Sequence, residues 1–137
     1  MAHSLTPELY VTDLEASLDF YCRLLGFEVE YARPEERFAC LKRGNVSLML
    51  EEPIGRNWLA GPLERPFGRG VNLQIMVEDV RALYATCQAA DANLFLALET
   101  KAYQRRDDTV SQTQFVVQDP DGYLIRFAQI EPRGIRD

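Results

Sequence analysis

The sequence predicts an α+β fold made of two tandem β-α-β-β-β modules, and two observations lead to this prediction. The first is an internal repeat. Residues 8–30 (ELYVTDLEASLDFYCRLLGFEVE) place a short strand before a helix, and residues 72–95 repeat that order, with Val77-x-Asp79-Val80 matching Val11-x-Asp13-Leu14. The second observation is that three strand-like segments follow each helix. Two copies of one module therefore account for nearly the whole chain.

Each predicted helix has apolar residues three and four positions apart, the spacing of an amphipathic helix. They are Leu14, Leu18, Tyr21 and Leu25 in the first helix and Val80, Leu83, Tyr84 and Cys87 in the second. Thr12 and Glu15 match a capping box, and Asp79 is placed to cap the second helix. Gly26 is placed to end the first helix, because glycine readily adopts the left-handed conformation found there.

The strands that complete each module are short apolar segments separated by turn residues. In the first module they are FEVEYAR (27–33), FACLKRG (38–44) and VSLMLEE (46–52), with a turn at Arg43-Gly44-Asn45. In the second they are NLFLALE (93–99), TQFVVQD (113–119) and GYLIRFAQ (122–129), with a turn at Pro120-Asp121-Gly122.

This organisation predicts a single domain, residues 1–137, whose modules span about residues 5–52 and 70–131. They are joined by a Gly/Pro-rich linker loop, EPIGRNWLAGPLERPFGRG (52–70), which holds the only tryptophan. A second loop, KAYQRRDDTVSQ (101–112), is expected to interrupt the second module. Loops of this length in a compact domain are often functional.

Composition excludes several classes of protein. The chain has 137 residues, of which 47% are hydrophobic, as in an ordinary globular domain. Its apolar runs are far shorter than the roughly 20 residues of a membrane span, and no secretory signal is visible, so a cytoplasmic protein is expected. Cys22, Cys40 and Cys87 form no CxxC pair and are expected to be reduced core thiols. A net charge of −6 argues against nucleic acid as a partner.

Strand alternation places polar residues on one face of each predicted sheet. Residues predicted to share this face are Thr6, Glu8 and Tyr10; Ser47, Met49 and Glu51; and Asn72, Gln74 and Met76. Their apolar neighbours point to the other side, where they can pack against the helices. A sheet with one polar face predicts a binding cleft rather than a second core.

Two segments carry a family resemblance, PELYVTDLEASLDFYCRLLGF (7–27) and FVVQDPDGYLIRFAQ (115–129). In this order and separation they resemble the vicinal oxygen chelate superfamily, which includes glyoxalase I, extradiol dioxygenases, fosfomycin-resistance transferases and bleomycin-resistance proteins. The resemblance is strongest to the bleomycin-resistance-like, metal-free branch. It implies that each module curls a mixed sheet around a cleft, and that two chains form a homodimer that completes each site.

The resemblance also locates four positions that hold a divalent ion in metal-dependent members of the superfamily. They fall here at Thr6, Glu51, Asn72 and Arg126. A divalent ion needs carboxylates, imidazoles or thiolates that converge on it, and a guanidinium at that distance would repel it. The expectation is therefore that the protein has no metal site and no cofactor.

Arg126 carries a full charge between two apolar residues of its strand, Leu124 and Ala128, and the resemblance places it on the cleft side. Three interpretations stay open. It forms a buried ion pair with Glu8 or Glu51, it offers its planar donor fork to a ligand carboxylate, phosphate or carbonyl, or it faces solvent. The predicted ligand-binding residues are Glu8, Met49, Glu51, Trp58, Asn72, Gln74, Tyr103 and Arg126.

Trp58 and Tyr103 enter that set because aromatic side chains on loops over a cleft can sandwich a flat ligand, and Phe67 lies in the same linker loop as Trp58. They serve equally well as lids on the core or as dimer contacts, and the sequence leaves this open. No residue is assigned a catalytic role.

Two functions follow. The first is a metal-independent small-molecule-binding protein that resembles bleomycin-resistance proteins and sequesters an antibiotic or another ligand. The alternative is an enzyme, either a lyase or a ring-cleaving dioxygenase with an atypical metal site built from residues such as His3, Glu8 and Glu51, or an enzyme without metal in which Arg126 stabilises an oxyanion. The first is preferred because three of the four metal positions hold poor ligands.

Overall fold

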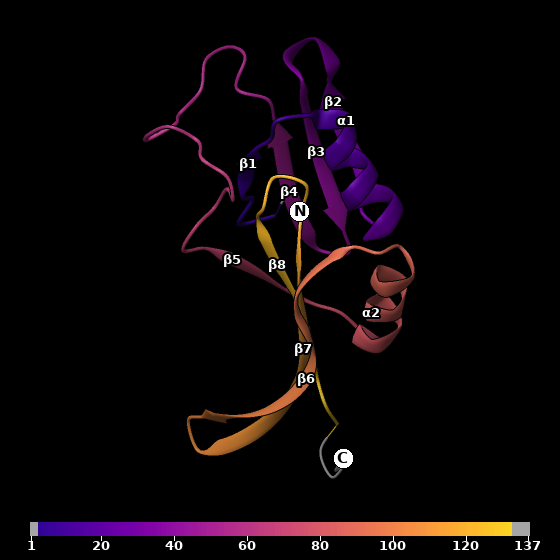
Figure 1. Ribbon diagram of the computed structural model, residues 1–137. Coiled ribbons are helices and arrows are strands. Elements are labelled where there is room, and N and C mark those ends of the chain that lie inside the picture. The colour runs from indigo at the N-terminus through magenta and orange to yellow at the C-terminus, as the bar shows by residue number, and fades with distance from the viewer. Residues whose placement is uncertain (1–2, 133–137) are drawn as a thin grey trace. The chain divides into compact units, whose positions relative to one another are not determined.

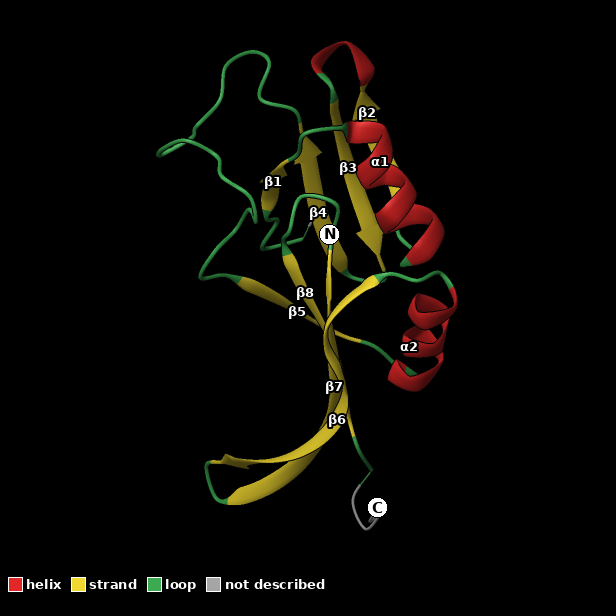
Figure 2. Cartoon of the chain, in the orientation of Figure 1, coloured by secondary structure: helices red, strands yellow, loops and turns green. Residues whose placement is uncertain are grey.

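The computed structural model describes residues 3–132, and the chain divides into two compact units. Unit 1 holds the residues up to Phe67 together with Pro120–Gly122, and unit 2 holds Gly68–Asp119 and the residues from Tyr123 onward. Each unit contains one four-stranded mixed sheet (Figure 1, Figure 2). The strand order is β1-β4-β3-β2 in sheet 1 and β5-β8-β7-β6 in sheet 2, so the predicted duplication is confirmed.

Sheet 1 is built from β1 (Glu8–Tyr10), β2 (Glu28–Arg33), β3 (Phe38–Arg43) and β4 (Val46–Glu51). Strand β1 runs parallel to β4, whereas the β2–β3 and β3–β4 pairs are antiparallel. The β3–β4 turn contains Gly44 with φ +60, in the left-handed region that glycine tolerates, as the sequence predicts. A short 3₁₀ helix, Pro34–Glu36, connects β2 to β3.

The helical segment of unit 1 starts as α1 (Leu14–Leu18) and continues as a π-helix, Asp19–Leu24. Gly26 follows it with φ +82, which confirms the predicted end. The predicted capping box is wrong, because the N-cap is Asp13, whose carboxylate accepts from the Ala16 N–H at 3.3 Å. The two predicted residues have other partners: the Thr12 N–H donates to the Asp121 carboxylate, and Glu15 accepts from Arg37.

Sheet 2 is built from β5 (Asn72–Met76), β6 (Asn93–Arg105), β7 (Asp108–Gln118) and β8 (Leu124–Ile130), with α2 (Val80–Ala89) between β5 and β6. Asp79 caps α2, as predicted, by accepting from the Ala82 N–H at 3.1 Å. Strand β5 runs parallel to β8, and the β6–β7 and β7–β8 pairs are antiparallel. This is the same pattern as in sheet 1.

Each sheet packs apolar side chains on the face that meets its helix, which we call the helix face. Those of sheet 1 include Leu9, Ala39, Leu41, Leu48 and Leu50, and those of sheet 2 include Ile75, Phe115, Val117, Ile125 and Phe127, all buried. Tyr84 of α2 lies edge-on to Phe115, with ring centroids 5.1 Å apart. Two cores therefore form, one for each helix–sheet pair.

The β6–β7 hairpin corrects the prediction of a loop at residues 101–112. Strand β6 continues to Arg105 and β7 begins at Asp108, so only the two residues between them turn. The last β7 residue that pairs with β8 in the register is Gln112, which lies opposite Ile130. Beyond that point the β6–β7 hairpin continues as a two-stranded ribbon (Figure 1). A ribbon exposed on both faces needs no apolar alternation, which is why its Lys, Gln, Arg and Asp residues resembled a loop.

The cysteines agree in part with the prediction of core thiols. All three are free, and Cys40 and Cys87 are buried, whereas Cys22 is only half-buried. Burial raises the pKa of the Cys87 thiol to about 11. In the described part of the chain, no helix has the length and hydrophobicity needed to cross a membrane.

Candidate functional site

The face of sheet 1 opposite its helix, here called polar face 1, brings together three of the predicted site residues. Register places Glu8 beside Met49 and Tyr10 beside Glu51 in the parallel β1–β4 pair. Because side chains alternate, these four share one face while Leu9 and Leu50 point to the helix face. All four are half-buried.

Two carboxyl groups interact on polar face 1. Burial raises the pKa of the Glu51 carboxyl, and Glu8 raises it further through its negative charge and a side-chain hydrogen bond, whereas the positive charge of Arg33 acts in the opposite direction. A neighbouring negative charge favours the protonated form of the Glu51 carboxyl group.

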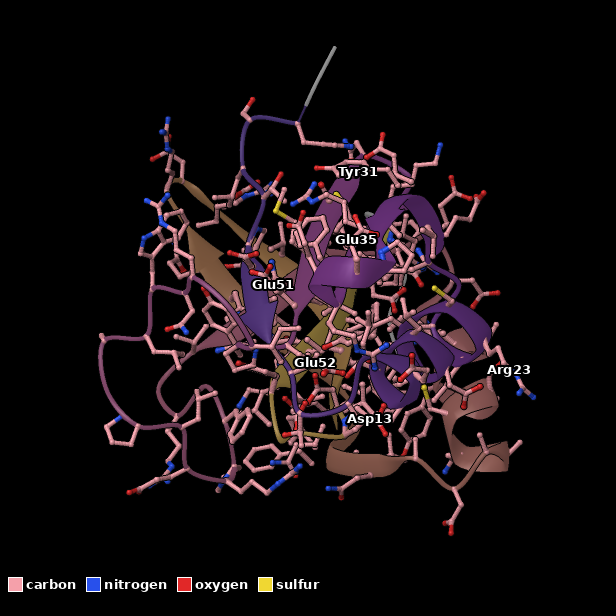
Figure 3. The ribbon with its side chains drawn as sticks, turned by 90° about the horizontal axis from the view of Figure 1, so that it is seen from above. Asp13, Arg23, Tyr31, Glu35, Glu51 and Glu52 are labelled. Atoms are coloured by element: carbon pink, nitrogen blue, oxygen red, sulfur yellow. The ribbon has the colours of Figure 1, made fainter. Side chains whose placement is uncertain are left out.

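Polar face 1 also contains a group that the sequence analysis did not single out. The Arg33 guanidinium carbon lies 4.0 Å from the centroid of the buried Phe38 ring. The centroid of the Tyr31 ring, labelled in Figure 3, lies 5.9 Å from that of Phe38. The Cys40 thiol, opposite Met49 in the register, is 3.7 Å from the Ser47 hydroxyl. Strand alternation in EVEYAR and FACLKRG would have found Tyr31, Arg33, Phe38 and Cys40, because it places them on the same face as Met49 and Glu51.

The linker aromatics have different positions. Trp58 donates its backbone N–H to the Tyr10 hydroxyl at 2.9 Å, which ties the linker to polar face 1, while its ring is 73% exposed. The Arg56 guanidinium carbon lies 5.2 Å from that ring. Phe67, by contrast, is only 8% exposed, which agrees with the alternative that it is a lid on the core.

The corresponding face of sheet 2, polar face 2, holds the other predicted residues. In the register Arg126 of the central strand β8 lies between Gln74 of β5 and Val116 of β7, and Asn72 lies opposite Leu124. The Arg126 Nε atom is buried and has no hydrogen-bond acceptor among the described residues. Arg126 also forms no ion pair within the described part of unit 2. A buried donor without an acceptor is rare in folded proteins.

A chain of side-chain amides crosses polar face 2. Gln112 Nε2 donates to Gln74 Oε1 at 3.2 Å and to Gln114 Oε1 at 2.9 Å. Gln114 Nε2 in turn donates to Glu99 Oε2 at 2.9 Å and to the Tyr103 hydroxyl at 2.8 Å. Tyr103 was predicted to lie on a loop, but it is a residue of β6 whose hydroxyl is part of this chain. Gln112 and Gln114 were missed because glutamines in a strand carry no sequence signal of a site.

The pairing of Arg126 with Glu8 or Glu51 stays a prediction. The two carboxylates belong to unit 1 and the guanidinium to unit 2. The geometry within each unit therefore gives one polar face to each unit, with the carboxyl groups of Glu8 and Glu51 on polar face 1 and the donors of Gln74 and Arg126 on polar face 2.

The four positions that the resemblance assigns to metal ligands do not fit a divalent ion. Only Glu51 offers a strong ligand, while Thr6 and Asn72 are weak and Arg126 is a cation. In the range 3–132, the single set of three His, Cys, Asp or Glu side chains close enough to share an ion is Asp13, Glu15 and Glu52. His3 is in no such set.

That acidic set lies at the start of α1, where Figure 3 labels Asp13 and Glu52. An arginine occupies it. The Arg37 guanidinium donates to Glu15 at 2.7 Å and to Glu52 at 2.8 Å. Glu52 also accepts from the Leu14 backbone N–H at 2.8 Å. The hydrogen bonds from Arg37 lower the pKa of Glu15 to about 2 and lower that of Glu52. These contacts satisfy the carboxylates without an ion.

Comparisons with known proteins agree with this architecture. The family model of the Glyoxalase/Bleomycin resistance protein/Dioxygenase superfamily matches residues 2–127. The bleomycin resistance proteins of Geobacillus stearothermophilus and of Staphylococcus aureus strain N315 are each 28% identical over 131 residues, which covers 90% of this chain and 93% of theirs.

Solved structures show the same fold. TioX from Micromonospora sp. ML1 is 22% identical with a TM-score of 0.75, covering 94% of this chain and 98% of its own. A glyoxalase/bleomycin resistance protein/dioxygenase from Alicyclobacillus acidocaldarius is 16% identical with a TM-score of 0.66, covering 93% and 91%. At these identities the likeness extends to the fold and no further.

Proposed function

Because the chain belongs to the glyoxalase/bleomycin resistance protein/dioxygenase superfamily, we propose that it is a metal-independent protein that binds and sequesters a small molecule, in the manner its resemblance to bleomycin resistance proteins suggests. An antibiotic is one such ligand. The proposal includes the homodimer and the cytoplasmic location that the sequence predicts, for which sedimentation and cell fractionation are the tests.

The observation that carries this proposal is the set of side chains at the four positions where a metal-dependent relative would hold its ion. An arginine stands at one of them, and its Nε is buried without an acceptor among residues 3–132. A guanidinium there repels a divalent ion and attracts hydrogen-bond acceptors. Polar faces made of amides, carboxyl groups and aromatic rings suit an organic ligand better than a metal.

A metal-dependent lyase or dioxygenase would need at least three convergent ligands. The described residues offer one such set, Asp13, Glu15 and Glu52, and Arg37 neutralises two of its members. No observation on the described residues favours an enzyme over a binding protein, and the addition of metal ions described below tests the enzymatic alternative.

The test is a thermal-shift series on the purified chain, with Mn, Ni, Zn and Fe(II) ions added separately and a panel of organic ligands that includes bleomycin. A ligand that binds only the native state raises its stability by about 2.7 kcal/mol at a hundredfold excess over its dissociation constant. We expect an organic ligand to raise the melting temperature and the metals to leave it unchanged.

Elemental analysis of protein purified without added metal is the control, and it should find well under one divalent ion per chain. Stoichiometric zinc, nickel, iron or manganese, or a rise in melting temperature with a metal alone, would refute the proposal.

A further inference from the structure

The direction of the amide chain on polar face 2 follows from the group at its end. A glutamine can present either its oxygen or its NH₂ group to a neighbour, so a row of glutamines has no preferred direction by itself. Glu99 removes this freedom, because an ionised carboxylate only accepts hydrogen bonds. Gln114 therefore turns its NH₂ group to Glu99 and its oxygen to Gln112.

The same constraint passes along the row. Gln112 meets the Gln114 oxygen with its own NH₂ group, and that group also donates to the oxygen of Gln74. Gln112 and Gln114 are 8% and 3% exposed, so the protein packing holds them in place. The NH₂ group of Gln74 is thus directed away from the chain of amides.

The end of the row lies next to Arg126. Gln74 and Arg126 are register partners on adjacent strands. The Gln74 NH₂ group has only the Met76 sulfur as a partner within the described part of its unit, at 3.7 Å, and a thioether is a weak acceptor. Arg126 Nε has no acceptor at all among the described residues. A buried charged donor without an acceptor among the described residues and an exposed amide donor with only a weak one therefore stand side by side.

We propose that Gln74 and Arg126 form a subsite for the carboxylate group of the ligand, with Glu99 as a positioning residue that acts through Gln114 and Gln112. This inference rests on the proposed function and adds the chemical class of the ligand. The guanidinium fork matches the two oxygens of a planar carboxylate, and the Gln74 NH₂ group supplies a further donor. A carboxylate also compensates the charge of Arg126, which forms no ion pair within the described part of its unit.

The experiment is a titration followed by ¹H–¹⁵N NMR of the full chain, observing the arginine Nε–Hε and glutamine NH₂ signals. The probes are benzoate and indole-3-acetate, each compared with its neutral amide, benzamide or indole-3-acetamide, and inorganic phosphate as a tetrahedral anion. The signals of Arg126 and Gln74 are assigned by their absence from the Arg126→Lys and Gln74→Met variants.

We expect at least one carboxylate to shift both signals saturably, and its amide and phosphate to bind about tenfold more weakly or worse. Arg126→Lys should weaken carboxylate binding by about tenfold, because lysine keeps the charge and loses the fork. The matched control is Arg105→Lys, at the tip of the hairpin in the same unit, where the affinity should not change. A subsite is refuted if no carboxylate shifts the signals, if amide or phosphate binds as tightly, or if Arg126→Lys binds as wild type.

The thermal-shift series separates the two proposals. If neutral or cationic organic ligands raise the melting temperature while the carboxylates leave the Arg126 signal unmoved, the binding function stands and the carboxylate subsite falls. If a carboxylate shifts the signal as expected but a metal alone raises the melting temperature, the subsite stands and the metal-independent function falls.

Discussion

Polar faces 1 and 2 hold different residues at corresponding places in the repeat. Aligning Val11 with Val77 makes Glu8 correspond to Gln74, and the parallel strand pairs then make Met49 correspond to Arg126. Unit 1 thus has a carboxylate beside a thioether, where unit 2 has an amide beside a guanidinium. On this face the two copies share geometry but not chemistry.

The helix faces differ much less. By the same alignment Leu9 corresponds to Ile75 and Leu50 to Phe127, and all four are buried apolar residues. Close packing restricts what a core position accepts, since a missing or additional methylene is costly there. A polar face has no such restriction, so its residues are free to differ according to what they bind.

The variants with the largest expected effect on stability test the packing of the helix faces. Phe127→Ala should lower the free energy of unfolding by about 3 to 5 kcal/mol, and Leu50→Ala by about 2 to 5 kcal/mol, because each leaves a cavity in a closely packed core. Urea denaturation of the full chain measures both. Losses below about 1 kcal/mol in either variant would contradict the idea that packing restricts both helix faces alike.

A second test concerns the acidic set of unit 1, which has no counterpart described in unit 2. The pKa of Glu15, about 2, and that of Glu52 lie below the ordinary value of 4.5. A carboxyl group whose pKa is lower in the folded state than in the unfolded state stabilises the fold above pH 4.5, and this stabilisation is lost as the pH falls toward 2. Wild type should therefore lose stability over this interval.

Arg37→Gln should reverse this part of the pH dependence. Without the guanidinium, Asp13, Glu15 and Glu52 repel one another when ionised, so protonation relieves the repulsion instead of breaking ion pairs. Denaturation curves at pH 7, 4 and 3 for both proteins would show it. Parallel losses of stability in the two proteins would contradict the assigned role of Arg37.

The Arg126→Met variant tests whether Arg126 on polar face 2 serves ligand binding rather than stability. Replacing a donor that lacks an acceptor with an apolar side chain should leave the free energy of unfolding unchanged or raise it by up to about 1 kcal/mol. The control is Arg81→Met, which removes an arginine that pairs with Glu131 at 2.8 Å and should lower stability. A clear loss in Arg126→Met would show that Arg126 has a structural partner in the native protein.

The smallest expected effect concerns Glu51. Glu8→Gln should lower the pKa of the Glu51 carboxyl, because it removes a neighbouring negative charge, and a ¹³C NMR titration of the carboxyl signal measures this. A carboxyl group whose pKa is higher in the folded state than in the unfolded state stabilises the fold at pH values below its unfolded pKa. This stabilisation is lost as the pH rises through the folded pKa. Wild type should thus lose more stability than Glu8→Gln as the pH rises above 4.5. An unchanged Glu51 titration would mean that Glu8 does not raise its pKa.

Features with a local cause were predictable from the sequence. The repeat follows from its hydrophobic spacing, the Asp79 cap from a side chain that reaches three residues along, and the Gly44 turn from a backbone conformation that few other residues adopt. Where a distant partner competed, the prediction failed: Asp121 takes the Thr12 N–H and Arg37 takes Glu15, so Asp13 caps α1 instead. Local preference predicts a contact only when no distant group offers a better one.

The sequence by itself determined the family, the duplicated strand order and the poor metal ligands at three of the four expected positions, because each depends on residue type and spacing. The tertiary structure alone decided how the polar side chains on each sheet are connected. A glutamine's orientation depends on which acceptors surround it, and Gln74, Gln112, Gln114 and Glu99 come from three strands. Their common direction, and the placing of the Gln74 NH₂ group beside Arg126, exist only once those strands are paired in register.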